Sequence, residues 1–170
     1  RRLAVGFENG ELIVRSTATE AQERVEIRAG FAVKALAFSP DAKVLFASAG
    51  PVSASWNLTG KKLVRRSPFR GLGGVTGAAW LTNHLLATIG EQGLLLSDDA
   101  KKANRSLGGG RLGHALALAA SVEDRSLCLA ERDGRLACLG RGRSASVAVG
   151  GLFESVSPEK MSGGRVVARH

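Results

Sequence analysis

The sequence lacks any apolar run long enough to cross a membrane as a helix. No uninterrupted hydrophobic stretch in its 170 residues approaches the roughly 18 residues that a spanning helix needs. This absence indicates a soluble protein with no membrane span. Hydrophobic residues still make up 44% of the chain and charged residues 23%, which suits a domain with a substantial core.

Cysteine is also scarce. Cys128 and Cys138 are the only two, and their spacing matches neither a disulfide framework nor a zinc knuckle. If Asp133-Gly134 forms a two-residue hairpin turn, the cysteines lie on opposite faces of that hairpin, because alternate residues of a strand switch face. We therefore expect two small core hydrophobes, no disulfide, and a reducing, cytoplasmic setting.

Histidines and glycine-rich stretches give no catalytic pattern. The three histidines, at 84, 114 and 170, have no other His or Cys at metal-ligand spacing. The runs Gly71–Gly74 and Gly108–Gly110 lack the Gly-Lys-Ser/Thr ending of a phosphate loop, so we expect them to permit close crossings between structural units. No catalytic residue, metal site or cofactor is predicted, and the protein is not expected to be an enzyme.

What the sequence does contain is a repeat of turn signals. Glu8-Asn9-Gly10, Glu91-Gln92-Gly93 and Arg132-Asp133-Gly134 each separate two apolar runs, as hairpin turns do. Their glycines stand at positions 10, 93 and 134. The interval from Gly10 to Gly93 is about twice the interval from Gly93 to Gly134. Gly50-Pro51 breaks the chain near the position where the missing member of this series falls. The turns therefore recur at a fixed interval along most of the chain.

Additional strands complete each repeat. A strand is predicted before three of the hairpins, at 33–38, 75–80 and 114–119, and a shorter strand follows every hairpin, within 24–27, 62–67, 103–107 and 144–149. We name the four strands of a unit a, b, c and d in chain order; the first unit enters at its b strand, near Leu3. No stretch shows helical periodicity. Four-stranded units that recur about every 40 to 45 residues are the signature of a β-propeller.

One repeat carries a family resemblance. In the stretch Val33–Leu63, the segment LAFSPDAKVLFASA is similar to the first two strands of a WD40 repeat, with a Ser39-Pro40-Asp41 turn between them. Trp56-Asn57 stands at the place of that family's Trp-Asp dipeptide. The other units lack this Trp and none begins with Gly-His, so the family's side-chain hydrogen-bond network is not carried over. The resemblance implies a propeller that binds other proteins, in most cases with seven blades.

We predict an all-β, WD40-like β-propeller of about four blades, each of four antiparallel strands. The predicted units are 1–28, 29–67, 68–108 and 109–150, and residues 151–170 begin a further blade or form a tail. The start on Arg1-Arg2, directly before a strand, favours a segment of a longer protein. Seven units would need roughly 290 residues, so we expect part of a larger ring. An unusually small ring, or a ring completed by a partner chain, are the alternatives.

The charge of the chain favours acidic partners. Lys and Arg number 24 against 15 Asp and Glu, which gives a net charge of +9. In a propeller the c–d turns project from one face, and basic residues recur there in successive units. The opposite face carries Glu8, Glu91 and Glu131. The candidate acidic-partner site is Lys61, Lys62, Arg65, Arg66, Lys101, Lys102, Arg105, Arg141 and Arg143. The alternative is a set of solvated turns that maintain solubility.

Three aromatic residues fall near the d–a crossovers, on the opposite, acidic face. Phe31, Phe69 and Phe153 form a candidate peptide-binding rim, although they could instead wedge between blades. We predict a non-catalytic protein-protein interaction scaffold within a larger protein or complex. The alternative is a nucleic-acid-associated propeller, for example in ribosome assembly, whose basic face contacts phosphates. Without Tyr, and with Trp56 and Trp80 expected to be buried, few aromatics can stack on bases.

Overall fold

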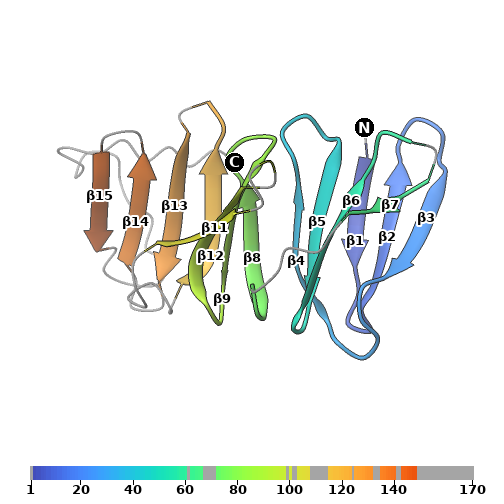
Figure 1. The fold of residues 1–170 in the computed structure, drawn as a ribbon, viewed down its shortest axis with the longest axis horizontal. Coiled ribbons are helices and arrows are strands. Elements are labelled where there is room, and N and C mark those ends of the chain that lie inside the picture. The colour runs from blue at the N-terminus through green and yellow to red at the C-terminus, as the bar shows by residue number, and fades with distance from the viewer. Residues whose placement is uncertain are drawn as a thin grey trace.

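The structure is a computed structural model made of β-strands. It describes residues 2–60, 62–66, 72–98, 100, 103–107, 115–123, 125–131, 135–140 and 143–148. These residues form fifteen strands in four antiparallel sheets, and this described part of the chain contains no helix (Figure 1). The same residues therefore include no helix long and apolar enough to span a membrane.

The first sheet has three strands in the order β1-β2-β3: β1 (Arg2–Gly6), β2 (Glu11–Ser16) and β3 (Gln22–Glu26). The second sheet comprises β4 (Val33–Phe38), β5 (Val44–Ala49), β6 (Val52–Asn57) and β7 (Val64–Arg65). The first sheet thus holds the b, c and d strands of its unit, and β1 is the equivalent of β5.

The third and fourth sheets repeat the four-stranded order of the second. The third comprises β8 (Val75–Trp80), β9 (Leu85–Gly90), β10 (Gly93–Asp98) and β11 (Ala103–Leu107). The fourth comprises β12 (Ala115–Ser121), β13 (Ser126–Glu131), β14 (Arg135–Gly140) and β15 (Arg143–Ala148). The predicted all-β architecture of repeated antiparallel units is confirmed. Residues 151–170, predicted to begin a further blade or to form a tail, lie outside the described residues.

The sheets stack face to face in chain order, from the first sheet at one end to the fourth at the other (Figure 1). Their a strands β4, β8 and β12 are neighbours, so the a strands form the inner side of the stack. Strands between two sheets are apolar on both faces, and every residue of β5 is buried. Burial between sheets, and not within any one sheet, therefore holds the stack together.

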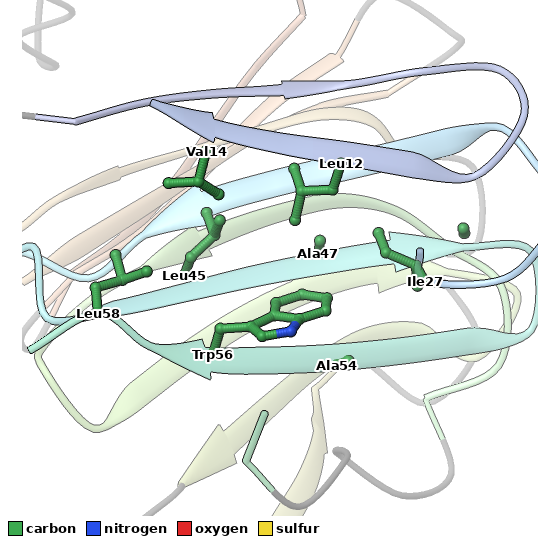
Figure 2. Packing of buried hydrophobic residues seen from close by; sticks show 9 residues of the cluster. Leu12, Val14, Ile27, Leu45, Ala47, Ala54, Trp56 and Leu58 are labelled. Atoms are coloured by element: carbon green, nitrogen blue, oxygen red, sulfur yellow. The ribbon is translucent and has the colours of Figure 1, made fainter. Parts of the chain in front are cut away.

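Each contact between successive sheets contains its own hydrophobic cluster. In the first contact, Leu12, Val14 and Ile27 of the first unit face the second sheet (Figure 2). The second sheet contributes Leu45, Ala47, Ala54, Trp56 and Leu58 to this cluster. Trp56 is 3% exposed and Trp80, in the next cluster, is 4% exposed, so the expected burial of both tryptophans is confirmed.

The two cysteines form a disulfide, and the prediction of two unpaired thiols on opposite faces was wrong. Cys128 of β13 lies directly opposite Cys138 of β14, with the two Cα atoms 4.1 Å apart. The expected two-residue turn placed Leu129 opposite Cys138. Instead, β13 ends at Glu131 and β14 begins at Arg135, so three residues connect them and the register changes by one.

The disulfide also removes the basis of the compartment prediction. Disulfides form and persist in oxidising environments and are rare in the reducing cytosol. The expectation of a reducing, cytoplasmic setting rested on two unpaired thiols, and those thiols are linked to each other. The cysteines therefore give that prediction no support.

Candidate binding surface

The a–b and c–d turns lie together at one end of each sheet, because the four strands of a unit run alternately up and down. In the second sheet the two turns are joined directly. The backbone N–H of Leu58, after the c strand, donates to the carbonyl oxygen of Lys43, before the b strand, at 2.8 Å. We call the end of the stack formed by these turns the c–d face.

Three polar residues set the start of the c–d turns at equivalent positions. Ser16, Asn57 and Asp98 end β2, β6 and β10, one repeat apart from each other in the chain. Each accepts a hydrogen bond from a backbone N–H two or three residues later, which closes a local turn. The bonds run from Thr19 N to Ser16 Oγ at 3.4 Å, from Thr59 N to Asn57 Oδ1 at 2.9 Å and from Ala100 N to Asp98 Oδ1 at 3.0 Å.

A cavity of about 680 Å³ opens on the c–d face between the first two sheets. Arg2 at the start of β1 and Lys62 in the c–d turn of the second unit bring two cationic side chains to it. The remaining lining residues are Val14, Ser16, Thr19, Ala21, Gln22, Glu23, Gly60 and Leu63. The cavity therefore combines an apolar part with cationic and hydroxyl groups.

Glu23 fixes one wall of this cavity. Its Oε2 accepts a hydrogen bond from the backbone N–H of Leu63 at 2.7 Å, which ties β3 to the chain segment that precedes β7. The carboxylate is thereby engaged in holding two neighbouring units together. Arg2 and Lys62 are both exposed to solvent. The charge that the cavity offers to an incoming ligand is therefore predominantly positive.

The a–b turn of the second unit, on the same c–d face, is held by a separate group of polar contacts. Asp41 Oδ1 accepts the hydroxyl hydrogen of Ser39 at 2.7 Å, and the Asp41 backbone N–H donates to Asn83 Oδ1 of the next unit at 3.0 Å. The Ser39 hydroxyl is the main cause that lowers the pKa of Asp41, with Lys43 adding to it. This turn is rigidly attached to both the second and the third units.

The structure places five of the nine predicted basic residues and brings one of them to the cavity. Lys62 lines it, whereas Arg65 in β7 and Arg105 in β11 are exposed on d strands. The backbone N–H of Arg66 donates to the carbonyl of Ser55 at 2.8 Å, and Arg143 begins β15. Lys61, Lys101, Lys102 and Arg141 lie outside the described residues.

The predicted aromatic rim is represented by one described residue. Phe31 is 41% exposed, and the guanidinium carbon of Arg28 lies 5.3 Å from its ring centroid. The ring also packs against Gly50 in the b–c turn of the second sheet, so closely that a side chain at Gly50 would clash with it. Phe31 therefore lies partly wedged between two units, on the face opposite the cavity. Phe69 and Phe153 lie outside the described residues.

Sequence reasoning missed Arg2, Glu23 and the three turn-starting residues. The regular spacing of Ser16, Asn57 and Asp98 was present as a signal, because each is the last residue of its c strand. Arg2 and Lys62 are far apart in the sequence and share a cavity only because the first two sheets stack. Within the described residues, no group of three or more His, Cys, Asp or Glu side chains could hold a metal ion.

Comparison with solved structures decides the fold. The crystal structure of the β-propeller domain of Cps50 (Swd1) from Myceliophteria thermophila matches with a TM-score of 0.69 and 20% sequence identity, over 87% of this chain. The fold is that of a β-propeller. The chain spans 51% of the length of that solved domain, about half. The four stacked sheets are therefore propeller blades, and the inner a strands lie toward the propeller axis.

Sequence comparison adds no family to this result. No protein-family model matches the propeller chain, and the search of curated proteins gives no match.

Proposed function

We propose that this chain is a non-catalytic protein-interaction platform, and that the cavity between its first two blades binds acidic segments of partner proteins. The observation that carries the proposal is the joint presence of Arg2 and Lys62 at one concave site. Two cations facing a cavity attract a carboxylate more strongly than isolated surface lysines do, because the walls exclude part of the water. The apolar lining by Val14 and Leu63 favours a ligand that also carries aliphatic groups.

The blades are proposed to be degenerate WD40 repeats. The best support is the second unit, in which the Ser39-Pro40-Asp41 turn is held by its own hydrogen bonds and Trp56 is buried between blades. We further propose that residues 1–170 form a single propeller segment, divided into the units 1–28, 29–67, 68–108 and 109–150, within a larger ring. Rigid blades would then present turns to a partner without a conformational change.

A binding experiment tests this function. The probe is a fluorescein-labelled peptide of alternating Glu and Val, titrated with the protein and followed by fluorescence anisotropy. We expect saturable binding that Lys62→Glu or Arg2→Glu weakens by on the order of tenfold, since each change replaces attraction with repulsion. Lys34→Glu is the matched control: it makes the same charge change on exposed β4 residue Lys34, away from the cavity, and should leave binding within about twofold.

If all three substitutions weaken peptide binding equally, the proposal is overturned. Binding would then depend on the overall charge of the protein and not on the cavity. A single-stranded oligonucleotide in the same titration separates the nucleic-acid alternative. Binding to phosphates falls steeply with salt through counterion release. Tighter binding of the oligonucleotide than of the peptide, with a steep salt slope and sensitivity to Lys62→Glu, would favour that alternative. The observation that favours the nucleic-acid alternative is the net charge of +9.

A further inference from the structure

The turn after β6 contains a tripeptide with the pattern of an N-glycosylation acceptor. Asn57-Leu58-Thr59 has an Asn, a middle residue other than Pro, and a Thr at the third position. Asn57 is the last residue of β6, and both Asn57 and Thr59 are exposed. An acceptor Asn needs this exposure, because a bulky, hydrated glycan must remain in solvent after the chain folds.

The side-chain contacts of Asn57 leave its amide nitrogen available. Asn57 Oδ1 accepts hydrogen bonds from the backbone N–H of Thr59 at 2.9 Å and from the Thr59 hydroxyl at 2.8 Å. Among the described residues, Asn57 Nδ2 has no hydrogen-bond partner. A glycan attaches to this nitrogen and leaves the carbonyl oxygen of the amide in place. The turn can therefore keep both of its hydrogen bonds when a glycan is attached.

The equivalent turns of the neighbouring blades close without an asparagine. Ser16 and Asp98 occupy the position of Asn57, and they accept hydrogen bonds from the backbone N–H groups of Thr19 and Ala100. A hydroxyl or a carboxylate therefore suffices for this turn. The acceptor amide of Asn57 is a chemical property that the turn itself does not require.

A second observation concerns the compartment in which the chain folds. Cys128 and Cys138 form a disulfide in the fourth blade. Disulfides form and persist in the secretory pathway and in other oxidising compartments, and they are rare in the cytosol. N-glycosylation acceptors are characteristic of secreted proteins. The disulfide and the tripeptide lie on different blades, and each independently indicates the same class of compartment.

We propose that Asn57 carries an N-linked oligosaccharide. The donor is an oligosaccharide joined to a polyprenyl diphosphate, and a membrane-bound oligosaccharyltransferase of the secretory pathway catalyses the transfer. The Asn57 amide nitrogen forms a bond to the anomeric carbon of the first sugar. The bond between that carbon and the diphosphate oxygen breaks, and polyprenyl diphosphate leaves with the bonding electron pair. The amide nitrogen loses one proton, and no group is oxidised or reduced.

The packing of this turn determines when the transfer takes place. Leu58, the middle residue of the tripeptide, is 1% exposed and points into the cluster between the first two blades (Figure 2). A transferase that recognises Asn57 and Thr59 must also hold the residue between them, which the folded protein keeps buried. We therefore expect the glycan to be added during synthesis, before the second blade packs on the first.

A second tripeptide of the same pattern lies in the third blade. Asn104-Arg105-Ser106 is exposed, but all three residues are within β11 and are paired with β10. We confine the proposal to Asn57, whose tripeptide leaves the sheet at Leu58 and reaches the turn. The experiment must therefore assign a glycan to a position and not only detect it on the protein.

The test maps the glycan on the full-length protein isolated from cells of the organism that makes it. Peptide-N-glycosidase removes an N-linked glycan and converts its asparagine to aspartate. When the reaction is run in water labelled with heavy oxygen, the label distinguishes this conversion from spontaneous deamidation. We expect peptide mass spectrometry to find the label at position 57, together with a fall in the mass of the protein. This mapping needs no variant, so it decides the proposal even where a variant fails to fold.

Variants produced in the same cells test the acceptor pattern. Thr59→Ala should abolish the glycan at Asn57, whereas Thr59→Ser should keep it, because the hydroxyl at the third position is retained. Asn9→Gln is the matched control. Asn9 is exposed and its Oδ1 accepts from the backbone N–H of Glu11 at 3.0 Å, so it forms the same local turn without a Ser or Thr at the third position. This variant should leave the glycan at Asn57 unchanged.

Three results would overturn the proposal. One is a protein from its own cells in which position 57 gains no label. Another is a label that persists at position 57 in the Thr59→Ala variant, which would mean that the modification does not follow the acceptor pattern. The third is a label found at Asn104 alone. None of these readouts involves the binding of an acidic peptide, so they leave the proposed interaction function to its own test.

Discussion

The indole Nε1 of Trp80 donates a hydrogen bond to the carbonyl oxygen of Ala37, 3.0 Å away. Trp80 ends β8 and Ala37 lies in β4, so this bond joins the a strands of two neighbouring blades on the inner side of the stack. Trp80 is only 4% exposed and belongs to the cluster between these blades. The same side chain therefore contributes both packing and a directional contact, which fixes how the third blade sits on the second.

Replacing Trp80 by Phe should cost more stability than replacing Trp56 by Phe. Both changes remove the same atoms from a buried cluster, but Trp80→Phe also leaves the Ala37 carbonyl without its indole donor. We expect Trp80→Phe to lower the free energy of unfolding by about 1–2 kcal/mol more than Trp56→Phe does. Urea unfolding followed by circular dichroism measures both, and equal losses would contradict the importance of the inter-blade bond.

Strand positions were predictable where the signal is local. The expected ranges 33–38 and 75–80 agree with β4 and β8, because apolar runs mark them directly. The range 103–107, expected from its place after a hairpin, agrees with β11. The β13–β14 register was not predictable, since Arg132-Asp133-Gly134 is compatible with a two- or a three-residue connection. The cavity could not be predicted from the sequence either. Arg2 and Lys62 are far apart in the chain, and only the packing of the first two blades brings them to one cavity.

Two glycines of the repeated turn should respond differently to substitution. Gly10 has φ +88° and Gly93 has φ +75°, so alanine is strained at both. A Cβ at Gly93 would meet no atom within 4 Å, whereas one at Gly10 would clash with the backbone carbonyl of Arg28. We expect Gly93→Ala to cost about 1 kcal/mol and Gly10→Ala about 3 kcal/mol. Thermal or urea unfolding compares them, and similar losses would contradict the close approach at Gly10.

The disulfide should stabilise the fourth blade measurably. It closes a hairpin across a sequence separation of 10 residues, and the chain-entropy model assigns about 2–3 kcal/mol to a loop of this size. Reduction by dithiothreitol should lower the free energy of unfolding by up to that amount. A double variant with Ala at positions 128 and 138 should not respond to dithiothreitol, which makes it the control. Free thiols that react with a thiol reagent in the folded, unreduced protein would contradict the pairing.

Acid should weaken the a–b turn of the second blade through Asp41. The Ser39 hydroxyl, followed by the backbone and charge of Lys43, holds the pKa of Asp41 below the ordinary value of 3.8, so its carboxylate stabilises the folded state at neutral pH. Because the folded-state pKa is lowered, this contribution is complete above about pH 4 and is lost as the pH falls through the lowered pKa.

The variant Asp41→Asn isolates this contribution. It keeps an oxygen that can accept from Ser39 but removes the titrating charge, so the wild type should be more stable than the variant at pH 7. The stability difference between them should shrink as the pH falls through the lowered pKa of Asp41, where the wild-type carboxylate takes up a proton. Urea unfolding at a series of pH values measures the difference. A difference that stays constant from neutral to acid pH would mean that Asp41 acts through its turn geometry and not through its charge.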